Sequence, residues 1–309
     1  MRERRSVGLL GATGHVGKVL AAGLSAEYAL TLYARRPEIA LAFARSLGLA
    51  ATVAPLAALG DGEHEALINC IGVGDPAAVS AEPARVYEVT CAADKLALDY
   101  LAQHPSCRLV NFSSGAAYCS AFEEPASDST VAALAAGALR PDQHYGLAKL
   151  ASEGRHRALS SLAIIDLRLF SLFSRHIDSS GSFLMNDVLH CVRDATPLVT
   201  GASDHVRDYI APSDLCALVA ACLESERVND AFDVYSAAPV SKFELLAAFG
   251  ERFRLGYTVD DSRTSASATG SKPAYFSLSR KASALGYAPV KTSLESLFEE
   301  SEVLLKTTR

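Results

Sequence analysis

The sequence lacks several features that would point to a membrane or to nucleic acid. It has no tryptophan, only two methionines and a formal net charge of −6. Its longest apolar runs, VAALAAGAL and LCALVAACL, fall well short of the ~18 residues that a membrane span needs. The apolar part of the N-terminal stretch MRERRSVGLLGATG is too short for a signal peptide. We therefore expect neither a membrane nor a nucleic-acid partner.

The seven cysteines are scattered, with no C-x-x-C pair and no metal-ligand spacing. Four of them, Cys70, Cys107, Cys191 and Cys216, lie in apolar surroundings. This pattern is typical of buried, reduced thiols in a cytoplasmic protein, and we expect no metal site.

The order of apolar segments predicts an α/β fold. Half of the 309 residues are hydrophobic, enough for one large domain and a smaller lobe. In the first half, short apolar strands such as SVGLLGA, ALTLYA and CRLVNFSS alternate with helices, including long ones at 82–103 and 142–160. This alternation predicts a doubly wound (Rossmann) parallel sheet. We expect the dinucleotide-binding domain at 1–168, with 205–237 returning to it, and a mostly C-terminal substrate lobe at 169–204 and 238–309.

A glycine-rich turn follows the first strand. In LLGATGHVGKVL, Gly11, Gly14 and Gly17 stand between the predicted strand and the first helix. Glycines here permit a tight turn and let backbone amides approach a pyrophosphate at a helix N-terminus. The position of the turn within a βαβ unit makes this a dinucleotide-binding signal.

The residues after the second strand bear on the choice of cofactor. An acidic residue there would bind a ribose hydroxyl and favour NAD, but the sequence reads LYARRPE. Arg35 and Arg36 suit a 2′-phosphate instead. We therefore expect a preference for NADP(H), with NAD(H) possible.

A tyrosine and a lysine lie four residues apart in YGLAKLASE, Tyr145 and Lys149. This spacing places both side chains on one face of a helix. An ammonium beside a phenol favours the phenolate, so Tyr145 could donate or accept a proton. The spacing alone is weak evidence, because such pairs are often structural.

Taken with NFSSGAAY and VRDYIAPSDLCALV, these motifs resemble the extended short-chain dehydrogenase/reductases, and within them the NAD(P)-dependent epimerase/dehydratase family. The resemblance covers nearly the whole chain and implies Ser114, Tyr145 and Lys149 as catalytic residues. It also implies a homodimer formed through the helices at 82–103 and 142–160. By the same resemblance, residues of the glycine turn, of the strand ends and of the Tyr–Lys pair would bind the cofactor: Gly11, Thr13, Gly14, His15, Val16, Gly17, Arg35, Arg36, Cys70, Ile71, Gly72, Tyr145 and Lys149. Polar side chains would bind the substrate: Ser113, Ser114, Ser171, Asn186 and Arg207.

The sequence departs from the family pattern at three places. Glu88 stands where members often have Asn, and Ser171 replaces an Asn that helps to bind the substrate diphosphate. After Ser114, Gly115 and Ala116 replace the Asp–Glu pair of the 4,6-dehydratases. A dehydratase is therefore disfavoured, because the acid and base that dehydration needs are missing.

The resemblance and the arginine pair together lead us to expect an NADPH-dependent reductase of a keto group on a nucleotide-activated sugar, most simply at C4. One alternative is an NAD-dependent nucleotide-sugar epimerase, which would use the same Ser–Tyr–Lys set. A reductase of a non-sugar carbonyl and a non-catalytic NADP-sensing regulator are further alternatives. The intact catalytic set argues against the regulator.

Overall fold

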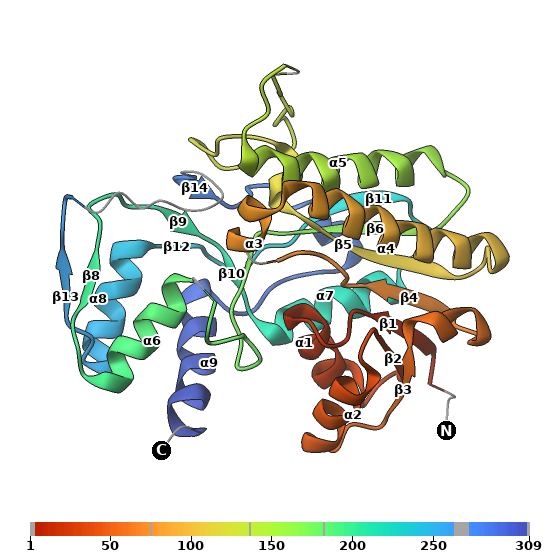
Figure 1. The fold of residues 1–309 in the computed structure, drawn as a ribbon, viewed down its shortest axis with the longest axis horizontal. Helices are drawn as coiled ribbons and strands as arrows, with labels where there is room; N and C mark the ends of the chain where they lie inside the picture. The colour runs from red at the N-terminus through yellow and green to blue at the C-terminus, as the bar shows by residue number, and fades with distance from the viewer. Residues whose placement is uncertain (1–3, 75, 136, 182, 263–271, 308–309) are drawn as a thin grey trace.

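A parallel sheet of seven strands forms the centre of the computed structural model, which describes residues 4–74, 76–135, 137–181, 183–262 and 272–307 (Figure 1). All the strand pairs in it are parallel, and the order is β11-β6-β5-β4-β1-β2-β3. The chain order reverses between β1 and β4, which opens a crevice at the carboxyl edge of the sheet. The strands are β1 (Ser6–Leu10), β2 (Ala29–Ala34), β3 (Ala51–Pro55), β4 (Ala66–Asn69), β5 (Arg108–Ser114), β6 (Ile164–Leu169) and β11 (Asp230–Asp233).

Helices cover both faces of this sheet, as Figure 1 shows. The central strands are almost wholly buried and apolar, because a parallel sheet has no face open to water. One face is covered by α1 (His15–Leu24), α2 (Pro37–Ser46) and α7 (Pro212–Glu224), and the other by α4 (Pro83–Gln103) and α5 (Pro141–Ala158). Shorter helices are α3 (Pro76–Ala81), η1 (Leu56–Asp61), η2 (Gly115–Tyr118) and η3 (Lys281–Leu285).

A smaller lobe lies beside the carboxyl edge of the sheet and has its own apolar core. Phe173, Met185, Leu246, Phe249 and Leu297 are among the buried side chains of that core. The lobe contains α6 (Leu184–Asp194), α8 (Lys242–Phe253) and α9 (Ser293–Thr307). Its short strands form small sheets. Strand β8 (Leu198–Thr200) pairs with β13 (Tyr257–Val259), and β9 (Val206–Arg207) pairs with both β12 (Val240–Ser241) and β14 (Ala274–Tyr275). Strand β7 (Ser171–Leu172) pairs with β10 (Tyr209–Ile210).

The doubly wound fold with a smaller lobe confirms the fold class that the sequence predicted. The strand at 51–55 was not foreseen, because this edge strand is short and its residues are at most half buried. All seven cysteines are free. In the described part of the chain, no helix is both long enough and apolar enough to span a bilayer.

Candidate active site

The glycine turn connects β1 to α1 at the crevice of the sheet. Gly11 has φ +80°, which favours glycine, and its N–H donates to the Tyr33 carbonyl at 3.1 Å. A Cβ on Gly11 would lie 3.0 Å from Ile71 N, and one on Gly17 would lie 2.3 Å from the Gly11 carbonyl oxygen. Backbone therefore fills the space that side chains would need. The turn forms a cradle of the kind that holds a dinucleotide pyrophosphate at the start of α1.

The turn is also joined to the lobe by a side chain. His15 Nε2 lies 2.7 Å from the hydroxyl of buried Ser174. Burial, followed by the charge on His176, lowers the pKa of His15 to about 4, so the ring is neutral at physiological pH. The His15 side chain thus connects the turn to the lobe, while Thr13 and Val16 are half-buried beside it.

The end of β2 carries the arginine pair that bears on the cofactor. Arg35 and Arg36 are both exposed at the crevice edge of the sheet. Among the described residues neither has an ion-pair partner. Both guanidinium groups are therefore accessible to an anion.

Lys149 is held by the main chain of β5. Its side chain is buried, and Nζ donates to the Phe112 carbonyl of β5 at 2.9 Å. A Cβ on Gly72 would lie 3.5 Å from that Nζ, so the chain after β4 passes close to the ammonium. Burial raises the pKa of the Cys70 thiol above its usual value, although the nearby charge of Lys149 acts in the opposite direction. Lys149 thus lies between β5 and the predicted cofactor residues Cys70, Ile71 and Gly72.

Ser114 ends β5, and its hydroxyl has two partners. Its Oγ accepts the N–H of Ala116 at 3.2 Å and lies 3.1 Å from the hydroxyl of Tyr275, which belongs to the lobe. Burial raises the pKa of Tyr275 to about 12, although the hydrogen bond with Ser114 acts in the opposite direction. Tyr275 therefore stays a neutral phenol that can donate to or accept from Ser114.

Tyr145 lies in the first half of α5, which also carries Lys149. Its half-buried ring packs against an apolar cluster that contains Val79, Val86 and Ala148. The structure therefore brings Lys149 of α5 and Ser114 of β5 to the same edge of the sheet, and Tyr145 lies one helix turn before Lys149.

Arg207 approaches this group from the lobe. It lies opposite Tyr275 in the β9–β14 pair, with its guanidinium 5.8 Å from the Tyr275 ring centre. Its Nη1 donates to the carbonyls of Val206 and Lys272. Burial lowers the pKa of Arg207. The charge is thus fixed beside the candidate site, where an anionic group of a substrate could meet it.

Three other predicted substrate residues have different surroundings. Ser113 donates to Glu153 Oε1 at 2.5 Å, which ties its hydroxyl to α5. The buried Asn186 amide donates to the carbonyls of Asp178 and Gly181 in the lobe. Ser171 is half-buried in β7, directly after β6. Contacts of these three residues with a substrate stay predictions.

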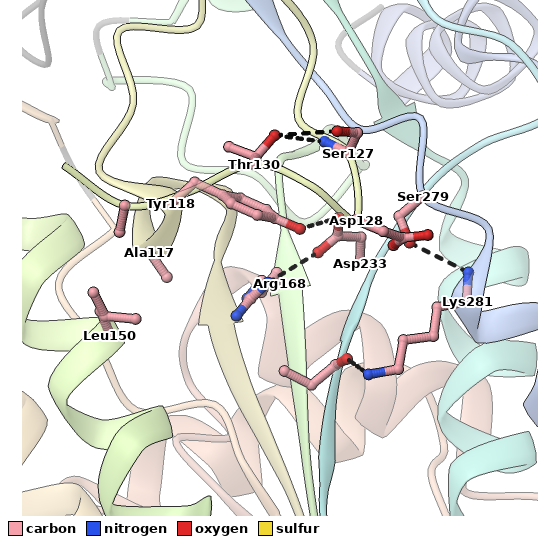
Figure 2. A pocket seen from close by; sticks show the side chains of 12 residues that line it. Ala117, Tyr118, Ser127, Asp128, Thr130, Leu150, Arg168, Asp233, Ser279 and Lys281 are labelled. Atoms are coloured by element: carbon pink, nitrogen blue, oxygen red, sulfur yellow. Dashed lines mark hydrogen bonds and ion pairs between the residues drawn. The ribbon is translucent and has the colours of Figure 1, made fainter.

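A cavity of about 460 Å³ lies beside the turn that follows β5. Figure 2 shows the side chains that line it. Its lining includes Tyr118, Arg168 and Asp233, but not Ser114, Tyr145 or Lys149. Tyr118 donates to Asp233 at 2.8 Å, and Arg168 lies 3.8 Å from the same carboxylate (Figure 2). These groups pair with one another, so paired charges border the cavity.

The turn after Ser114 leaves no room for a longer side chain. A Cβ on Gly115 would lie 2.4 Å from the ring of Phe170. An acidic residue at this position would therefore require Phe170 to move.

The fold and the site define an α/β enzyme that binds a dinucleotide. A profile of the NAD dependent epimerase/dehydratase family matches residues 7–238, and the chain belongs to this family. The predicted family and the predicted enzyme class, an NAD(P)-dependent enzyme of the extended short-chain dehydrogenase type, are thus confirmed. No curated protein sequence matches the chain.

Solved structures with the same fold cover the whole chain at low identity. A UDP-glucose-4-epimerase from Stenotrophomonas maltophila, with bound NAD and formylated UDP-arabinopyranose, has a TM-score of 0.82 and 17% identity over 98% of each chain. A UDP-glucose 4-epimerase from Thermotoga maritima, with UDP-glucose, has a TM-score of 0.81 and 16% identity over 98% of this chain and all of that one. A UDP-glucuronic acid 4-epimerase from Bacillus cereus, with UDP-glucuronic acid and NAD, has a TM-score of 0.76 and 16% identity over the same shares.

Sequence reasoning missed Tyr275. The segment SKPAYFSLSRK carries no local signal that its tyrosine reaches Ser114, which lies 161 residues earlier in the chain. The neighbouring match to the family began at Ser279, in SRKASALGYAP, just after this tyrosine. An aromatic residue so close to a matched motif was the one available hint.

Proposed function

We propose that the protein is an NAD-dependent epimerase that inverts C4 of a UDP-linked sugar. The observation that carries the proposal is the meeting of Ser114, Lys149 and the helix turn of Tyr145 at the crevice, next to the glycine cradle. Three 4-epimerases with this fold, solved with NAD, UDP-sugars or both, support the epimerase better than the ketoreductase favoured by the sequence.

In this proposal, Tyr145 accepts the proton of the sugar hydroxyl as the carbon is oxidised, and returns a proton to the oxygen when the carbon is reduced from its other face. Ser114 binds the same oxygen and orients it. Lys149, one helix turn after Tyr145, binds the ribose of the cofactor. When bound, the nicotinamide supplies the site that takes up and gives back the hydride. Arg207 meets the diphosphate of the substrate, and Ser113, Ser171 and Asn186 line the sugar site.

The experiment is to purify the protein, release its bound nucleotide by denaturation, and identify it. The native protein is then incubated with UDP-glucose without added cofactor. We expect tightly held NAD and the appearance of the C4 epimer, and we expect Tyr145→Phe to bind NAD without turnover. A protein that carries no NAD and converts no UDP-sugar would refute the proposal.

One observation favours a second candidate, the NADPH-dependent reductase of a 4-keto nucleotide sugar. The two exposed guanidinium groups of Arg35 and Arg36 can reach an anion at the end of β2. Consumption of NADPH with a 4-keto nucleotide sugar, without epimerisation of UDP-glucose, would establish this candidate instead.

We also propose that the protein is a cytoplasmic homodimer paired through α4 and α5. The outward residues of α4 include Glu88, Cys91, Ala92 and Lys95, so this face carries both small and charged side chains. On α5 the outward residues include Ala151, Gly154 and Ala158, whose small side chains permit close helix packing. Light scattering at micromolar concentration should give the mass of a dimer, and a monomer would refute the pairing.

The division of the chain also stays a proposal. We assign residues 1–168 and 205–237 to the dinucleotide-binding domain, and 169–204 and 238–309 to the substrate lobe.

A further inference from the structure

Helix α5 contacts the sheet and helix α4 through several buried polar groups. Lys149, Ser152, Glu153 and His156 all lie on its inward face and are buried. Each has a polar partner outside the helix: Lys149 the Phe112 carbonyl, Ser152 Asp94, Glu153 Ser113 and Arg168, and His156 two aspartates. Polar contacts are directional, so they can define the position of a helix along its axis more narrowly than apolar packing does.

His156 lies at the centre of these contacts and is fully buried. Its Nδ1 lies 2.9 Å from Asp166 Oδ1, and its Nε2 lies 2.5 Å from Asp94 Oδ1. A carboxylate accepts hydrogen bonds, and a neutral imidazole has one N–H. Both ring nitrogens can donate at once only when the imidazole carries two protons. The geometry therefore calls for a buried imidazolium between Asp94 and Asp166.

The charges around this ring alternate. Arg155 donates to Asp94 at 2.5 Å, and Arg157 donates to Asp166 at 2.8 Å. The sequence of charges is then Arg155, Asp94, His156, Asp166 and Arg157, which come from α5, α4 and β6. Burial lowers the pKa of His156, but the hydrogen bonds to Asp166 and Asp94 outweigh it and raise the pKa to about 9.

The same network reaches the cofactor edge of the sheet. The buried Asn111 donates to Asp166 Oδ1 at 2.6 Å, and the buried Asn69 donates to Asn111 at 2.9 Å. Asn69 Oδ1 in turn accepts the N–H of Ile71 at 3.1 Å, at the point where the chain leaves β4. One continuous set of hydrogen bonds thus connects the catalytic helix to the predicted cofactor residues.

We propose that doubly protonated His156, held between Asp94 and Asp166, is a positioning residue that holds α5, with Tyr145 and Lys149, in register with the cofactor-binding end of β4. Its part in turnover rests on the proposed function, whereas its part in NAD binding does not. The imidazolium acts through the helix and through Asn111 and Asn69, without touching the substrate. Loss of its proton removes one N–H donor and leaves one carboxylate without its partner.

The sign of the pH effect follows from the raised pKa. The contribution of His156 is fully present below its unfolded pKa of about 6.5 and is lost as pH rises through about 9. We therefore expect NAD affinity and turnover per folded molecule to fall together above pH 9. The expected loss of turnover is about 100-fold, since displacement of a catalytic group by about 1 Å has an effect of this size.

Asp94→Asn is the variant that separates this role from simple stability. Its amide can donate to His156 Nε2, so a neutral imidazole then satisfies both neighbours. The variant should fold and should keep its NAD affinity from pH 7.5 to 10, measured by titration calorimetry with NAD on protein stripped of its bound nucleotide. His156→Gln should bind NAD more weakly than the wild type at pH 7.5, and this difference should shrink as pH rises through about 9. The exposed His190→Gln is the matched control, with wild-type behaviour.

Nuclear magnetic resonance of ¹⁵N-labelled histidine tests the protonation directly. The His156 signal is assigned as the one missing in His156→Gln, or from a spectrum of Asp94→Asn. In the wild type, His156 should carry protons on both ring nitrogens at pH 7.5 and lose one of them near pH 9. A neutral ring at pH 7.5 would overturn the proposal. So would a wild-type NAD affinity that stays constant through the loss of this proton, even if Asp94→Asn fails to fold. If the protein converts no UDP-sugar, the proposed function is refuted. The NAD titrations and the histidine resonances still test the role of His156, because neither measurement depends on turnover.

Discussion

Gly146 lies beside Tyr145 at the closest approach of α5 to the turn after β5. A Cβ at this position would lie 2.2 Å from the Ala116 carbonyl oxygen, which is backbone and cannot rotate away. Restoring an ordinary contact requires a shift of about 1 Å between α5 and η2. Because the Ala116 N–H donates to Ser114 Oγ, such a shift changes the position of Tyr145 relative to Ser114.

Gly146→Ala should therefore reduce turnover by about 100-fold, the effect expected for a misplacement of about 1 Å. It should also destabilise the fold by about 1–3 kcal/mol, as overpacked sites do. The assays are turnover of UDP-glucose and urea unfolding. The matched control is Gly60→Ala in η1, away from the helices of the proposed dimer, where a Cβ meets nothing within 4 Å. This variant should be fully active and more stable by about 0.4–1 kcal/mol. Wild-type turnover and stability in Gly146→Ala would refute the reasoning.

Three further variants test single groups of the site. Tyr145→Phe should fold and bind NAD but lose about 10²–10⁴-fold in turnover, because it removes the proton donor; undiminished activity would exclude the proposed mechanism. Tyr275→Phe removes the hydroxyl 3.1 Å from Ser114 and should lower kcat/KM by up to about tenfold, the scale of one hydrogen bond, with unchanged NAD affinity by calorimetry. Arg35→Ala should weaken binding of NADPH more than that of NADH in parallel titrations, and equal losses would rule out a contact with the 2′-phosphate.

Much of the fold could be predicted because its signals are local. Apolar runs or helical periodicity in the sequence predict the strand at 29–34 and the helices near 15–24 and 83–103. Strand β3 is an edge strand with few buried residues, so its apolar signal is weak. The lobe is built from strands of two or three residues, which leave almost no pattern in the sequence.

In the candidate site, too, the sequence predicts local features but not contacts between distant residues. The glycine turn and the spacing of Tyr145 and Lys149 are visible within a few residues of sequence. The contact of Ser114 with Tyr275 joins positions 161 residues apart, and that of His156 with Asp94 joins positions 62 apart. No local pattern encodes such pairs, because they arise when strands and helices pack. In the sequence His156 is one of three consecutive basic residues at the end of a helix, where a basic residue would be expected on the helix dipole alone.

Glu300 on α9 offers a last test, of how the lobe is joined to the segment after β7. This buried carboxylate accepts the Arg175 backbone N–H at 2.6 Å and two guanidinium hydrogen bonds at 2.9 and 2.7 Å. Burial raises the pKa of Glu300, but these bonds outweigh it and lower the pKa below its usual value. A carboxylate with a depressed pKa stabilises the fold above its unfolded pKa, and this contribution is lost as pH falls through the lower, folded value.

Glu300→Gln should therefore cost about 1–3 kcal/mol at pH 7, from the loss of hydrogen bonds to a charged group. The lower half of that range is the better expectation, because the Arg175 side chain is 39% exposed and can be hydrated again. Urea unfolding from pH 7 to pH 3 should show the wild type and the variant converging as the carboxylate is protonated. Glu302→Gln on the same helix breaks an exposed ion pair with Arg252 and should change the unfolding midpoint little. A difference between wild type and Glu300→Gln that is constant with pH would show that its charge does not stabilise this junction.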